Sequence, residues 1–175
     1  MFGNFSTAVG FDNDSTLIIK DATIRGTGNA VSGCNTTPGT PTIIIENSSL
    51  ISDQNGFQLT DKGQATLTNV NIDASTCIFA SGYEGGSHII IDGGKYNAGS
   101  YVVKMQNGAN VEIKDGEFNF NDINNFATFN KTGAGTITIT GGTFNGINYL
   151  EFFTNGQVIN GGLVSINGTT VTIAK

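Results

Sequence analysis

The chain has 175 residues, of which 25 are Gly and only 13% are charged. Frequent Ile, Thr, Val, Asn and Gly are typical of short strands joined by tight turns, so we expect an all-β domain. The net charge of −6, with no cluster of cations, argues against a nucleic-acid partner, because phosphate binding requires a basic surface. No apolar run reaches membrane length, so we expect no membrane insertion.

An apolar pattern recurs along the chain. In each copy two apolar residues flank one other residue, and a third apolar residue follows after four more. The seven copies are Leu17-Ile19-Ile24, Ile43-Ile45-Leu50, Ala65-Leu67-Ile72, Ile89-Ile91-Tyr96, Val111-Ile113-Phe118, Ile137-Ile139-Phe144 and Val164-Ile166-Val171.

The second apolar residue of each copy, which we call the anchor, defines the repeat length. The anchors at positions 19, 45, 67, 91, 113, 139 and 166 recur at steps of 22 to 27 residues. Such steps are too short for a strand-helix-strand unit and suit one coil of a solenoid. The sequence therefore predicts a right-handed parallel β-helix of about seven coils over residues 15–175, preceded by an N-terminal cap segment, residues 1–14.

The residues after each anchor predict a turn in every coil. Two places beyond the anchors stand residues that tolerate a positive φ or bond their own backbone. They are Asp21, Asn47, Asn69, Gly93, Asp115, Gly141 and Gly168.

Short polar residues occupy the sixth place after four successive anchors. They are Asp73, Asn97, Asn119 and Asn145. Stacked coils would bring them within about 4.8 Å of one another. We expect a hydrogen-bonded structural ladder here rather than a ligand-binding row.

The place just before the anchor should face outward, because side chains alternate along a strand. In the N-terminal half it holds Ile18, Ile44 and Ile90. Outward apolar residues in nearby coils predict an oligomer interface, unless the cap segment with Phe2, Phe5 and Phe11 covers them.

A further apolar cluster follows most anchors and predicts the remaining sides of each coil. It comprises Val31, Phe57 and Leu59, Ile78 and Phe79, Tyr101 and Val103, Phe126 and Phe129, and Phe152 and Phe153.

Two runs carry a resemblance to a known superfamily. Residues 136–145, TITITGGTFN, and residues 89–97, IIIDGGKYN, resemble coils of the pectate-lyase-like right-handed β-helix superfamily. Its members include polysaccharide lyases and hydrolases, phage tailspikes and fibres, adhesins and carbohydrate-binding proteins. The resemblance extends over about residues 15–173 and implies the fold, not the function, because core and turn residues carry it.

The catalytic residues of that superfamily have no counterpart here. Its lyases use an Arg or Lys base beside carboxylates that hold calcium, whereas Arg25, the one Arg, lies in the first coil. Its hydrolases use grouped Asp residues near Gly-His-Gly, whereas His88 stands in Ser-His-Ile. Asp92 and Asp115 lie among lysines, which suits surface ion pairs. We therefore predict no catalytic residues, with a lyase or hydrolase as an alternative.

Metal ligands are equally sparse. Cys34 and Cys77 lack the spacing of a metal pair and are expected in the core. The oxygen-rich residues 12–14 and 53–56 lack the complete calcium-loop pattern, so they are interpreted as turn caps. We predict no metal site and no cofactor, with calcium as the one ion that such residues suit.

These observations favour a non-enzymatic structural solenoid, a rigid fibre, spike or adhesin component of a virion or cell surface. We expect no signal peptide in this chain, because no basic region followed by an apolar segment stands among its first residues. We expect self-association, as a trimer or end to end. The alternative is a carbohydrate-binding β-helix domain of a bacterial surface protein. In that case loop aromatics would stack on surface glycans, with Tyr83, Phe120 and Phe126 as the candidates.

Overall fold

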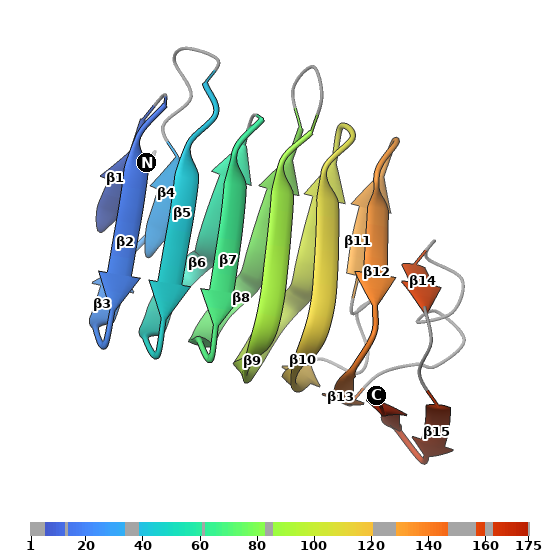
Figure 1. Ribbon diagram of the computed structural model, residues 1–175. Coiled ribbons are helices and arrows are strands. Elements are labelled where there is room, and N and C mark those ends of the chain that lie inside the picture. The colour runs from blue at the N-terminus through green and yellow to red at the C-terminus, as the bar shows by residue number, and fades with distance from the viewer. Residues whose placement is uncertain are drawn as a thin grey trace, which may run out of the picture.

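The computed structural model of the protein describes residues 6–12, 14–33, 39–60, 62–82, 86–120, 129–146, 157–159 and 163–174. Within these residues every regular element is a β-strand, and the strands form one 16-stranded sheet. The sheet winds into a parallel solenoid of about five turns (Figure 1). The prediction of an all-β parallel solenoid is confirmed.

The strands divide into three faces. The anchor face contains β2 (Thr16–Lys20), β5 (Thr42–Glu46), β7 (Gln64–Thr68), β12 (Thr136–Ile139), β14 (Gln157–Ile159) and the first parts of β9 (His88–Gln106) and β10 (Asn110–Phe120). The ladder face contains β3 (Thr23–Gly26), β13 (Gly142–Asn145), β16 (Thr170–Ala174), β15 (Leu163–Asn167), the first parts of β6 (Ser49–Thr60) and β8 (Asn71–Ser81), and the middle of β9 and end of β10. The third face contains β1 (Val9–Phe11), β4 (Val31–Gly33), β11 (Phe129–Thr132) and the ends of β6, β8 and β9.

The anchors form a continuous buried column on the anchor face. Parallel register places each anchor beside the next, from Ile19 to Ile139. Ile45, Ile91 and Ile113 are 0% exposed. Alternation along each strand therefore buries the apolar residues that the repeat predicts, and their contacts stabilise the stack through the hydrophobic effect.

The first four turns between the anchor face and the ladder face place a positive φ at the expected residue, whereas the next two place it one residue later, at Gly116 and Gly142. Asp21, Asn47 and Asn69 have φ values of 50°, 47° and 51°. In the next coil, Gly94 has a φ of 95°, and a Cβ there would lie 2.1 Å from the Val70 carbonyl oxygen. The close approach of neighbouring coils thus requires glycine at position 94.

A stack of rings fills the core behind the ladder face. The Tyr96 and Phe118 ring centroids lie 4.8 Å apart, and those of Phe118 and Phe144 lie 4.6 Å apart. Burial raises the pKa of the Tyr96 hydroxyl well above its usual range. That hydroxyl donates to the Gly93 carbonyl at 3.3 Å, which satisfies the polar end of the buried ring.

The seventh copy of the repeat does not continue the parallel solenoid. Val164 and Ile166 lie on β15, which pairs antiparallel with β16, and they are 41% and 48% exposed. The strand aligned in parallel with β12 is β14, where Ile159 rather than Ile166 is the register partner of Ile139. The expectation of seven coils was therefore too high, because an alternating pattern does not specify strand direction.

The predicted cap segment contributes a strand to the solenoid. Within it, β1 pairs in parallel with β4, and Phe11 packs on Phe57 with ring centroids 6.5 Å apart. Phe2 and Phe5 lie outside the described residues. Ile18 remains 56% exposed beside the described part of the cap segment, residues 6–12 and 14.

Candidate functional site

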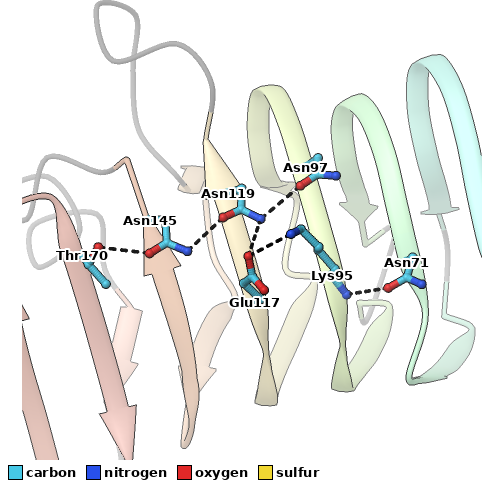
Figure 2. Close-up of polar contacts among 7 residues, drawn as sticks. All are labelled: Asn71, Lys95, Asn97, Glu117, Asn119, Asn145 and Thr170. Carbon is cyan, nitrogen blue, oxygen red and sulfur yellow. Dashed lines mark hydrogen bonds and ion pairs between the residues drawn. The ribbon is translucent and has the colours of Figure 1, made fainter.

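The most regular polar feature of the surface is a chain of amide side chains on the ladder face (Figure 2). Asn97, Asn119 and Asn145 are register partners in successive coils. The Asn119 Nδ2 donates to Asn97 Oδ1 at 3.0 Å, and the Asn145 Nδ2 donates to Asn119 Oδ1 at 2.9 Å. The Thr170 hydroxyl donates to Asn145 Oδ1 at 3.0 Å, so every donor points toward the N-terminal coil.

Asp73, the fourth residue expected in this ladder, stands in register beside Asn97 but is not part of the chain. In the described part of the structure it makes no hydrogen bond with Asn97, and its side chain is exposed. A carboxylate could accept from the Asn97 amide, but no such bond forms among the described residues. The ladder therefore ends at Asn97.

A charged column runs beside the amide ladder. The Asn119 Nδ2 also donates to Glu117 Oε1 at 3.0 Å, and Lys95 Nζ lies 3.1 Å from the same oxygen. These contacts lower the pKa of the Glu117 carboxyl, with the hydrogen bond from Asn119 as the larger cause. The Lys95 backbone N–H donates to Asn71 Oδ1 at 3.0 Å, which extends the network to a further coil.

A shallow hollow of about 240 Å³ adjoins the N-terminal end of the ladder. Its polar lining includes Asp73, Asn97, Asn71 and Lys95, and Ile51 adds an apolar wall. The hollow offers both hydrogen-bond donors and hydrogen-bond acceptors. Its cation, Lys95, is already paired with Glu117.

The outward isoleucines lie where the sequence predicts. Ile18 and Ile44 are register partners, whereas Thr66 separates Ile44 from Ile90. Ile18 is 56% exposed, and Ile44 and Ile90 are half-buried. The apolar surface is therefore continuous across the first two residues only.

Of the three aromatic residues expected to stack on glycans, the structure describes one. Phe120 is 6% exposed and belongs to the core, so its ring has no open face for a sugar. Tyr83 and Phe126 lie outside the described residues.

A pair of aromatic side chains on the third face was missed as a surface feature. Phe79 and Tyr101 were expected on a further side of each coil, and there both are half-buried and face outward around Lys104. The Lys104 Nζ lies 5.8 Å from the Phe79 ring centroid and 6.0 Å from that of Tyr101. The signal was present for Phe79, because Ile78 and Phe79 are consecutive and cannot both point inward in a regular strand.

Amide side chains border this aromatic pair. Gln58 is the register partner of Phe79, and Gln58 Oε1 accepts from Asn55 Nδ2 at 3.0 Å and Asn29 Nδ2 at 3.2 Å. We call Gln58, Phe79, Tyr101 and Lys104 the aromatic platform. Flat rings beside amides and a cation offer the stacking and hydrogen-bonding groups that a sugar ring requires.

The described carboxylates were predicted to form neither a metal site nor a catalytic group. Among the described residues, no group of three or more His, Cys, Asp or Glu side chains is placed to hold a metal ion. Asp92 aligns with Asp115 rather than with Lys114, because a bulge shifts the register there. Burial raises the pKa of the Cys77 thiol well above its usual range, so this core cysteine stays protonated.

Comparison with protein-family models, curated proteins and solved structures found no match to this chain. No helix in the described ranges has the length and apolarity needed to cross a membrane. The fold and the surface therefore define the class, a parallel β-solenoid protein with an amide ladder along one face.

We expect Asn119→Ala to lower the free energy of unfolding by about 1–3 kcal/mol, since Asn97 and Asn145 each lose a partner. Urea denaturation followed by circular dichroism measures the change. Asn130→Ala is the matched control, because this half-buried Asn makes no hydrogen bond through its side chain within the described structure. A loss below about 0.5 kcal/mol in Asn119→Ala would mean that the ladder is not stabilising.

Proposed function

We propose that the protein is a non-enzymatic structural solenoid, a rigid component of a fibre, spike or adhesin on a virion or cell surface. The observation that carries this proposal is the stack of parallel, in-register coils along one axis, from β2 to β12 (Figure 1). A body built this way transmits load between its ends through every coil in turn, because each coil contacts mainly its neighbours.

Three sets of interactions run parallel to that axis and support a rigid rod. Main-chain hydrogen bonds join each coil to the next, the amide ladder links Asn97 to Thr170, and the stacked rings of Tyr96, Phe118 and Phe144 fill the interior. Bending the rod would strain all three sets at once, since close-packed interiors resist deformation.

Fibre and spike components act as assemblies, and the proposal includes lateral self-association. Ile18 and Ile44 form an apolar pair on the outside of the first coils. Exposed apolar side chains stacked in adjacent coils favour contact with an equivalent surface. A trimer would bring three such columns together around its axis.

The lateral contact predicts that Ile44→Lys reduces the oligomeric mass, because a charge replaces an apolar side chain at the contact. Multi-angle light scattering at micromolar concentration measures the mass. Thr23→Lys is the control, since Thr23 is exposed on β3 of the ladder face and not on the anchor face that carries Ile44. An equal mass for wild type and Ile44→Lys would contradict the lateral contact.

The aromatic platform favours a second candidate function, recognition of surface glycans. Two half-buried rings on adjacent coils present apolar surface to solvent, and Gln58 brings a side-chain amide beside Phe79. In a protein of net charge −6, Lys104 forms no ion pair with the described carboxylates. It therefore adds an available cation to the platform.

If the platform binds glycans, Tyr101→Ala should weaken binding at least about tenfold, since it removes one stacking ring. A printed panel of neutral and acidic glycans, followed by calorimetry on any hit, measures the affinity. Tyr101→Phe keeps the ring and should retain most of the binding. Equal affinity in Tyr101→Ala would remove the platform from this role. Cleavage of a panel glycan that is lost in Asp92→Asn would overturn the non-enzymatic proposal instead.

A further inference from the structure

Strand β15, which ends the order of strands on the ladder face, exposes the side of the sheet that faces the core in the other strands. Residues opposite each other in an antiparallel pair share a face of the sheet. Val164 is opposite Ile173, and Ile166 is opposite Val171. Ile173 and Val171 are 2% and 0% exposed, whereas Val164 and Ile166 are 41% and 48% exposed. The core side of β15 is therefore uncovered although that of β16 is buried.

The backbone of β15 is also open on one side. This strand ends the order of the sheet and pairs only with β16 among the described strands (Figure 1). Unpaired donors and acceptors on such an edge pair readily with another strand unless charges, Pro or a bulge prevent it. The sequence of β15, LVSIN, contains neither a charged residue nor Pro. The edge has no such protection of its own.

The N-terminal end of the solenoid, in contrast, carries charged residues on its first strands. The first strands of the anchor face and the ladder face, β2 and β3, carry the exposed cations Lys20 and Arg25. At the C-terminal end, Lys175 is the one charged side chain among residues 152–175, and the strands β15 and β16 carry none. Two C-terminal ends can therefore meet without like-charge repulsion between these segments, whereas pairing with an N-terminal end would place charges beside an apolar edge.

We propose that β15 pairs with β15 of a second copy of this chain and forms a tail-to-tail dimer. In an antiparallel pair centred on Ser165, Val164 lies opposite the Ile166 position of the second copy, and the reverse pair follows by symmetry. A two-fold axis through that centre keeps both uncovered core sides on the same face of one continuous sheet. Cross-strand pairs of β-branched residues stabilise such a contact. The two solenoids then point away from each other, and the rod doubles in length.

The tail-to-tail dimer extends the proposed structural role but does not depend on the lateral contact at Ile44. Size-exclusion chromatography coupled to small-angle X-ray scattering separates the two contacts. Tail-to-tail pairing roughly doubles the maximum dimension and leaves the cross-section unchanged, whereas lateral association thickens the particle. A dimer of unchanged length would contradict the pairing of β15 and leave the lateral proposal intact.

The decisive variant is Ile166→Lys, which should weaken the elongated dimer at least about tenfold because it introduces like charges at a symmetric apolar contact. Ile166 is exposed, so folding should persist and is checked by circular dichroism. Ile18→Lys is the matched control: it changes an exposed isoleucine near the other end and should leave the elongated dimer intact. An elongated dimer that survives Ile166→Lys would overturn the proposal.

A cross-link supplies a second readout. Residues directly opposite in an antiparallel pair have Cα atoms about 4.5–5.5 Å apart, within the range of a disulfide. Ser165→Cys, in a Cys34→Ser background, should therefore give a disulfide-linked dimer under mild oxidation. Asn110→Cys, exposed at the start of β10, is the control and should remain monomeric on a non-reducing gel. Equal cross-linking of the two variants would contradict the proposed centre of symmetry.

Discussion

The in-register stacking of one coil on the next is the constraint on which the rest of the structure depends. Parallel pairing places each residue directly beside its equivalent in the neighbouring coil. All residues of one column therefore face the same environment, either the core or the solvent. Inward columns are therefore apolar, as from Ile19 to Ile139. The same constraint brings Asn97, Asn119 and Asn145 within hydrogen-bonding distance. Outward columns need not be apolar, and their residue types differ from coil to coil.

Much of this fold was predictable because the repeat length, the side-chain alternation and the turn residues agree. Asp21, Asn47 and Asn69 stand two places after their anchors and adopt the positive φ that the turn needs. The ladder from Asn97 to Asn145 follows directly from the period, since equal distance from the anchor means equal position in the coil. Asp73 shows the limit of that argument, because register alone does not decide which side chains form hydrogen bonds.

Two features could not be obtained from the distance to the anchor. The Val164-Ile166 alternation matches the earlier copies, yet its strand runs antiparallel, and only the surrounding pairing decides this. On the third face, the register of β8 with β6 and β9 shifts before Thr76, so the distance from the anchor no longer assigns side chains to the inside or the outside. Both features bear on function, because they leave β15 uncovered and place the aromatic platform on the surface.

The register of the stack can be measured directly with engineered cysteine pairs in a background of Cys34→Ser and Cys77→Ala. Thr42 and Gln64 are exposed register partners on β5 and β7, and adjacent parallel strands hold such partners within disulfide reach. Thr42→Cys with Gln64→Cys should cross-link rapidly and within one chain, whereas Thr42→Cys with Thr66→Cys, displaced by two residues, should not. Faster cross-linking of the displaced pair would contradict the register, and with it the ladder and the columns that depend on it.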